Sequence, residues 1–303
     1  MGDQAQSLRE MVKKTGCEAD SCPETSAAEA ALIKQRHLAK VISIASGKGG
    51  VGKSFLTVNL ALALHRLDLK VLIIDADFGL ANIDVMLGMP ARYNLSHLLK
   101  REHSLEEIVQ EWPGGIKFIS GGSGIGELMH MEEAQLTRII DDMMHLSEPM
   151  DIILCDTGAG VNETVLRMAA ASTETVLVTT PEPTAILDAY ALLKILTHNE
   201  DTHHIRLIMN KAVSYKESEN AVKSFLGITR KYLDKHIEPV GSILYDNDVG
   251  RSIKQQTPLL LSQPQSATAK DIFAIAETLA DLPTGKNPSG RLAQLFSRWL
   301  KPS

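Results

Sequence analysis

From Val41 onward, short apolar runs alternate with longer stretches in which apolar residues recur every three or four positions. Short runs that are mainly apolar predict strands buried on both faces, at residues 41–45, 70–74, 116–120, 151–155, 174–180, 205–210 and 240–244. The amphipathic stretches predict helices at 54–67, near 132–145, from 163, at 184–196, within 217–234 and at 269–282. Strands that alternate with helices in this way predict an α/β fold, a mostly parallel twisted sheet flanked by helices on both faces.

The two ends of the chain have a different texture from this alternating region. Residues 1–38 are polar, rich in Ala and Glu, and predict an N-terminal extension with a short helix that Asp3 can cap. Residues 283–290 have the composition of a linker. After the linker, five apolar side chains recur at helical spacing: Leu292, Leu295, Phe296, Trp299 and Leu300. We therefore expect an extension at 1–38, a core domain at 39–282, and a linker with an amphipathic helix at 283–303.

Composition narrows the class of protein. Hydrophobic residues make up 44% of the 303 positions but aromatic residues only 4%, so aliphatic side chains must build the core. The net charge of −6 gives no strong signal for nucleic-acid binding. The three cysteines form neither a disulfide framework nor a zinc pattern, which suits a reducing cytosol. No run reaches the roughly 20 apolar residues that a membrane span requires, and we expect a cytoplasmic protein, peripheral to a membrane at most.

The strongest chemical signal is a glycine-rich segment, residues 47–54, between the first predicted strand and helix. It fits the pattern G-x-x-x-x-G-K-[ST], in which backbone N–H groups surround a triphosphate. The lysine Lys53 is expected to neutralise the β- and γ-phosphates, and the Ser54 hydroxyl to ligate Mg²⁺. This predicts ATP and Mg²⁺ as cofactors, bound by Gly47, Lys48, Gly49, Gly50, Val51, Gly52, Lys53, Ser54 and Phe55.

Lys48 gives this loop a second lysine that an ordinary P-loop does not require. The pattern Gly-Lys-Gly-Gly-x-Gly-Lys-Ser resembles the deviant P-loop of the MinD/ParA class of ATPases, which includes the nitrogenase iron protein. The resemblance implies that Lys48 reaches across a homodimer interface to the phosphates of the other subunit. Hydrolysis would then depend on dimerisation, because the charge stabilisation comes from the partner.

The same resemblance implies roles for polar residues at the ends of other strands. Asp156 is expected to be the Walker-B aspartate that holds Mg²⁺ through water. Asp77 would orient the attacking water and complete a catalytic set with Lys48 and Lys53, while Asp75 would support the Mg²⁺ shell. The alternative for Asp77 and Asp75 is that they are helix-cap or turn residues. Asn210 matches the adenine-reading asparagine of the class, with a strand-end turn residue as the alternative.

Three strings resemble one subfamily, the flagellar-number ATPases (FlhG, also called FleN): residues 3–9, 79–82 and 179–194. The resemblance implies that the N-terminal helix stimulates a partner, the flagellar GTPase FlhF of the signal-recognition type. The residues expected to engage FlhF are Asp3, Gln4, Ala5, Leu8 and Arg9. The resemblance also implies a further partner, either a flagellar transcriptional activator or a switch (C-ring) protein.

The terminal apolar stripe predicts a helix that lies in the headgroup region of a membrane. Two copies in an ATP-bound dimer would bind inner-membrane lipid far more strongly than one, so attachment at the inner face of the cell membrane would be reversible. A frayed N-terminus and a C-terminal helix packed on its own core are the simpler alternatives for the two ends.

Other functions on the same fold remain open. A MinD-like division-site ATPase shares the P-loop and is hard to separate by sequence. A ParA-like partition ATPase needs clustered basic residues, and the chain has no dense Lys/Arg block. Iron–sulfur carriers of this class use C-x-x-C near the C-terminus, and that pattern is absent from the sequence.

Overall fold

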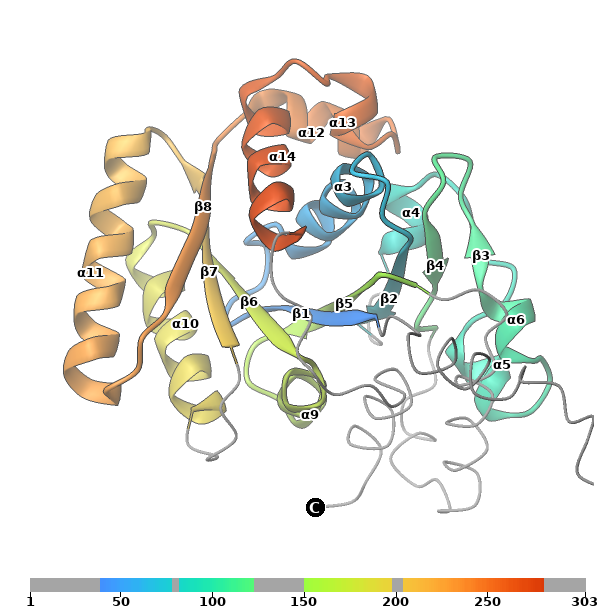
Figure 1. Ribbon diagram of the computed structural model, residues 1–303, viewed down its shortest axis with the longest axis horizontal. Coiled ribbons are helices and arrows are strands. Elements are labelled where there is room, and N and C mark those ends of the chain that lie inside the picture. Colours follow the sequence, from blue (N-terminus) through green and yellow to red (C-terminus); the bar gives the residue numbers. More distant parts are fainter. Residues whose placement is uncertain (1–38, 78–81, 123–149, 198–203, 281–303) are drawn as a thin grey trace, which may run out of the picture. The chain divides into compact units, whose positions relative to one another are not determined.

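The computed structural model describes residues 39–77, 82–122, 150–197 and 204–280. These residues form an eight-stranded sheet in the order β3-β4-β2-β5-β1-β6-β7-β8 (Figure 1). All neighbouring pairs are parallel except β3 with β4. The strands are β1 (Lys40–Ser46), β2 (Val71–Ala76), β3 (Gln110–Glu111), β4 (Lys117–Ile119), β5 (Ile152–Ala159), β6 (Glu174–Thr179), β7 (His204–Ala212) and β8 (Glu238–Leu244).

Helices cover both faces of this sheet (Figure 1). On one face lie α3 (Lys53–His65), α13 (Leu259–Ser262) and α14 (Ala267–Ala280). On the other face lie α9 (Glu163–Ala171), α10 (Pro183–Leu196) and α11 (Tyr215–Leu233). Alternate residues of the central strands serve the two faces: Ile42 and Ile44 belong to the first core and Ala45 to the second. The predicted α/β fold is therefore confirmed.

The long elements lie close to where the apolar pattern places them, but short ones were missed. These are α4 (Ile83–Met86), α5 (Leu95–Leu99), α6 (Leu105–Ile108), α12 (Asn247–Lys254), α13 and the strand β3. One or two turns are too short for a helical period to emerge, and side-chain caps mark the start of α5, α6 and α12 instead. Asn94 caps α5 and Ser104 caps α6, each in a reciprocal capping box.

Some predictions fall outside the described residues. These are the helix near 132–145, the partner-binding residues Asp3 to Arg9 and the C-terminal apolar stripe at 292–300. Within the described ranges, no helix is long and apolar enough to cross a membrane.

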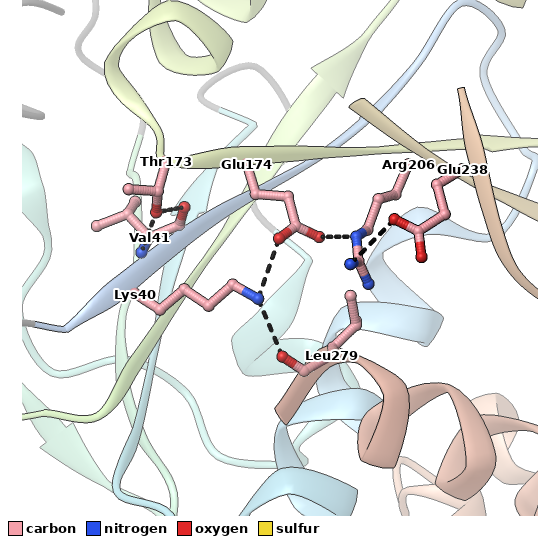
Figure 2. Close-up of polar contacts among 7 residues, drawn as sticks. All are labelled: Lys40, Val41, Thr173, Glu174, Arg206, Glu238 and Leu279. Atoms are coloured by element: carbon pink, nitrogen blue, oxygen red, sulfur yellow. Dashed lines mark hydrogen bonds and ion pairs between the residues drawn. The ribbon is translucent and has the colours of Figure 1, made fainter. Parts of the chain in front are cut away.

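A buried chain of ion pairs crosses the amino ends of four parallel strands (Figure 2). Lys40 Nζ lies 3.0 Å from Glu174 Oε2, and Arg206 Nε lies 3.0 Å from Glu174 Oε1. The chain ends at the half-exposed Glu238, whose Oε2 is 3.1 Å from Arg206 Nη2. Lys40 Nζ also donates to the carbonyl of Leu279, near the end of α14, at 2.9 Å. Charged residues at or near the start of β1, β6, β7 and β8 thus tie α14 to the sheet.

Candidate functional site

The strand order brings the polar strand ends together at the carboxyl edge of the sheet. β1, which leads into the glycine-rich loop, lies between β5 and β6, and β2 lies beside β5. In the β2–β5 register Asp75 is paired with Asp156. In open parallel sheets this edge is where ligands bind. Segments that are far apart in the sequence therefore converge on one place.

The loop between β1 and α3 ends in a helix N-terminus that no side chain caps. Gly52 precedes α3 with φ 99° and has no side-chain cap hydrogen bond. Lys53 is the first residue of α3, and its side chain is buried. Free N–H groups, the helix dipole and a lysine together favour an anion at this position.

A cavity of about 860 Å³ opens in front of this helix N-terminus. Among the residues predicted for the site, its lining includes Gly49, Gly50, Gly52, Lys53, Ser54, Phe55, Asp77 and Asn210. Gly47, Lys48, Val51, Asp75 and Asp156 are not part of the lining. Asp75 and Asp156 are fully buried, so the structure places them behind the wall of the cavity.

Gly47 fixes the start of the loop against α10. A Cβ at this position would lie 2.1 Å from the carbonyl oxygen of Asp188, which is closer than any side-chain carbon is tolerated. Only glycine therefore allows the loop and the second turn of α10 to approach so closely.

Lys48 is held within its own chain. Its Nζ donates to Glu182 Oε2 at 2.8 Å and to Thr184 Oγ1 at 2.9 Å, at the beginning of α10. This contact lowers the pKa of Glu182, first through the hydrogen bond and then through the charge of Lys48.

Asp156 is a buried carboxylate that lies against the first turns of α3. Its Oδ1 accepts a hydrogen bond from Thr57 Oγ1 at 3.2 Å, while Oδ2 is buried and has no hydrogen-bond partner in the structure. Burial raises its pKa from 3.8 to about 6, against the opposing effects of Ser54, Lys53 and Thr57. An unsatisfied buried carboxylate oxygen beside a serine hydroxyl fits the outer shell of Mg²⁺, which prefers oxygen ligands.

Asp75 organises the loop that follows β2. Its two oxygens accept backbone N–H bonds from Asp77 at 3.1 Å, Asn82 at 2.9 Å and Ile83 at 3.2 Å. Burial, and then the charge of Asp156, raises its pKa from 3.8 to about 7. The contacts are those of the turn-residue alternative; a role in the Mg²⁺ shell stays a prediction.

Asn210 contacts the glycine-rich loop directly. Its Nδ2 donates to the carbonyl oxygen of Val51 at 2.7 Å, and its Oδ1 accepts from the backbone N–H of Lys211 at 2.9 Å. Part of the amide is thus already engaged, and adenine reading by Asn210 stays a prediction.

The far wall of the cavity comes from a region that the sequence analysis did not single out. It runs from the end of β8 through α12 and includes Tyr245, Asp246, Val249, Arg251 and Ile253. A tyrosine ring and aliphatic side chains suit the flat face of a base, and Arg251 adds a positive charge. The available signal was the Asp246 cap that starts α12. Cys155 is fully buried on β5.

Comparison with known proteins agrees with this geometry. A family model described as ParA, NUBPL iron-transfer P-loop NTPase, matches residues 37–280. The chain is 34% identical to the antiactivator FleN of Pseudomonas aeruginosa over 262 residues, covering 86% of this chain and 94% of FleN. It is 36% identical to the flagellum site-determining protein YlxH of Helicobacter pylori over 267 residues, which cover 86% of this chain and 90% of YlxH.

Solved structures show the same fold. The MinD protein of Pyrococcus horikoshii, complexed with Mg-ADP, superposes with a TM-score of 0.65 at 22% identity, covering 80% of this chain and 97% of that one. A chain of the MinC:MinD cell division protein complex of Aquifex aeolicus superposes with a TM-score of 0.66 at 24% identity. The match covers 82% of this chain and 99% of that one.

Proposed function

This chain belongs to the ParA/MinD family of P-loop NTPases, and from that premise we propose that it is a dimerising switch ATPase that regulates the number and placement of flagella. The observation that carries the proposal is its similarity, over most of both chains, to a flagellum site-determining protein and to the antiactivator FleN. The same fold serves other tasks, so the fold alone does not select this one.

The site supports binding and hydrolysis of ATP. The free N-terminus of α3 and the Lys53 ammonium would hold the phosphates, and Ser54 with Asp156 would hold Mg²⁺. Bound Mg²⁺ would neutralise charge that develops on the phosphate oxygens. Asp77, which lines the cavity, would orient the attacking water.

Dimerisation would bring in Lys48 from each subunit. To reach the phosphates of a partner subunit, Lys48 must leave Glu182 and Thr184. A triphosphate with its greater charge would compete better for the lysine than a diphosphate, so the dimer would form with ATP.

The two ends of the chain would connect this switch to the cell. We assign partner contact, and stimulation of the flagellar GTPase FlhF, to Asp3, Gln4, Ala5, Leu8 and Arg9. We propose that five apolar side chains bind reversibly to the inner face of the cell membrane: Leu292, Leu295, Phe296, Trp299 and Leu300. A further partner would be a flagellar transcriptional activator or a switch (C-ring) protein.

The test is to count flagella per cell after Lys53→Ala or Asp77→Ala replaces the residue in the chromosomal copy. We expect an altered number or position of flagella and normal division. Minicells with normal flagella would point instead to a division-site function like that of MinD.

A matched test in vitro measures dimerisation and lipid binding of the purified chain. We expect a monomer with ADP and a dimer with ATP and Mg²⁺, and vesicle binding that is lost when residues 290–303 are deleted. A protein that stays monomeric with ATP and Mg²⁺ would overturn the switch.

A further inference from the structure

We propose that Asn210 and Lys211 are positioning residues that aim two consecutive backbone N–H groups of the glycine-rich loop at the phosphates. The proposal rests on the proposed function to the extent that the cavity binds a nucleoside triphosphate. It goes beyond that function because it assigns Lys211 a role and gives Asn210 one that does not involve the base.

Two neighbouring carbonyl groups of the loop are bound by two neighbouring side chains of β7. Asn210 Nδ2 donates to the carbonyl oxygen of Val51 at 2.7 Å, and Lys211 Nζ donates to that of Gly50 at 2.6 Å. The contacts join positions 159 and 161 residues apart in the chain. Consecutive peptide units of the loop are thus held from the same side.

Holding these carbonyls orients the N–H groups. In a trans peptide unit the N–H points away from the C=O. Because the Gly50 carbonyl is bound by Lys211, the Val51 N–H points the opposite way, and the Val51 carbonyl does the same for the Gly52 N–H. Two successive N–H groups on one side of a loop form a concave site for an anion.

The backbone of β7 is irregular at this point, which explains how both side chains reach the loop. In a regular strand, neighbouring side chains point to opposite faces. Here the β7–β8 register shifts between Met209 and Ala212, and Lys211 has φ 60°, a conformation that is costly for a residue with a Cβ. Strained residues and bulges of this kind cluster at functional sites.

The fit of the loop around Asn210 is tight. A Cβ on Gly52 would lie 2.5 Å from Asn210 Nδ2, so the two residues are in close contact. The Asn210 amide is further fixed by the backbone N–H of Lys211, and the residue is 4% exposed. A rigid amide that already binds the loop suits a support for the phosphate site.

The test separates support of the phosphate site from reading of the base. Calorimetry would measure binding of Mg-ATP and of Mg-tripolyphosphate, which has no base, to the full chain and its variants. For Asn210→Ala and Lys211→Met we expect both affinities to fall in parallel, by about three- to tenfold for the loss of one hydrogen bond. Lys211→Arg should recover most of the affinity, and Lys223→Met, on the exposed face of α11, should change neither.

Lys211→Gly distinguishes positioning from a general effect on folding. Glycine adopts φ 60° without strain, and this gain offsets the entropy that glycine adds to the unfolded chain, so the melting temperature of the nucleotide-free protein should stay close to that of wild type. The affinity for tripolyphosphate should nevertheless fall as in Lys211→Met.

Loss of ATP affinity in the variants with unchanged tripolyphosphate affinity would overturn the proposal and make Asn210 a base reader. Unchanged affinity for both ligands would also overturn it. If the wild-type chain bound neither ligand, the proposed function itself would fail, which is a different result.

Discussion

Lys48 forms an ion pair with Glu182 of its own chain, with 2.8 Å between Nζ and Oε2. The family resemblance implies that the same lysine serves the partner subunit in the ATP-bound dimer. One side chain cannot occupy both places, so the contact within the chain opposes the contact between chains.

Glu182→Gln weakens this contact and is expected to favour the dimer. The ion pair is largely exposed, with Glu182 66% exposed, so we expect a modest effect, a two- to fivefold lower concentration for half-dimerisation, roughly the scale of exposed pairs. Analytical ultracentrifugation with ATP and Mg²⁺ measures it. Glu219→Gln, which removes a similarly exposed pair with Lys223 on α11, is the control. A weaker dimer for Glu182→Gln would show that Glu182 supports the interface.

Asp77→Asn is expected to separate binding from hydrolysis. Asp77 lines the cavity, and an amide keeps its shape but replaces one acceptor oxygen with an N–H donor, so it cannot orient the attacking water in the same way. ATP hydrolysis should fall by roughly 10²–10⁴-fold, while ATP affinity by calorimetry stays within a few-fold of wild type. Asp68→Asn, in the exposed turn that follows α3, should leave both unchanged. Equal hydrolysis in Asp77→Asn and wild type would remove Asp77 from the catalytic set.

Gly52→Ala and Gly50→Ala should differ sharply although both glycines have positive φ. A Cβ at Gly52 would lie 2.5 Å from Asn210 Nδ2, whereas a Cβ at Gly50 meets nothing within 4 Å. Gly50→Ala adds only backbone strain, on the order of 1 kcal/mol, but Gly52→Ala must also displace the loop. We expect nucleotide binding to be lost in Gly52→Ala and retained, though weakened, in Gly50→Ala. Comparable binding by both variants would contradict the close contact.

The raised pKa values of Asp75 and Asp156 predict how stability depends on pH. The folded-state values of about 7 and about 6 exceed the usual 3.8, so the folded chain takes up protons at a higher pH than the unfolded chain. Stability from these groups therefore rises as pH falls from 8 toward 5, with a slope of up to about 1.4 kcal/mol per pH unit for each proton.

Asp75→Asn tests this dependence because it removes one of the two titrating groups. The free energy of unfolding of the nucleotide-free protein, measured in urea at pH 8 and pH 6, gives the difference between wild type and variant. As the pH falls, the free energy of unfolding of wild type should increase relative to that of Asp75→Asn. A difference that does not change with pH would contradict the raised pKa of Asp75.

The buried ion pairs at the opposite edge of the sheet predict a large effect on stability. Glu174→Gln removes the buried carboxylate that pairs with both Lys40 and Arg206 and should destabilise the fold by about 3 kcal/mol. For a domain of this size that corresponds to a melting temperature lower by roughly 6–12 °C. Glu238→Gln, at the exposed end of the chain of ion pairs, should cost about 1 kcal/mol or less. Calorimetric melting curves that rank the two variants in the reverse order would refute this account.

Much of the fold was readable from local pattern. The strands β1 and β6 and the helix α10 begin and end within two residues of the predicted positions, and α9 begins where predicted. Short helices such as α5 and α12 were missed, because caps at Asn94 and Asp246, not an apolar period, define them. The pattern also left the far wall of the cavity unmarked, since Tyr245 and Arg251 belong to no motif.

By itself, the sequence determined the phosphate-binding loop, since glycines, a lysine and a serine at fixed spacing act through the backbone that carries them. It also determined the α/β class, because apolar periods report burial locally. Only the tertiary structure decided which distant residues meet: Asp75 beside Asp156, Lys48 on Glu182, and Asn210 with Lys211 on the loop. The order of strands in a sheet depends on packing between segments far apart in the chain, which no local spacing encodes.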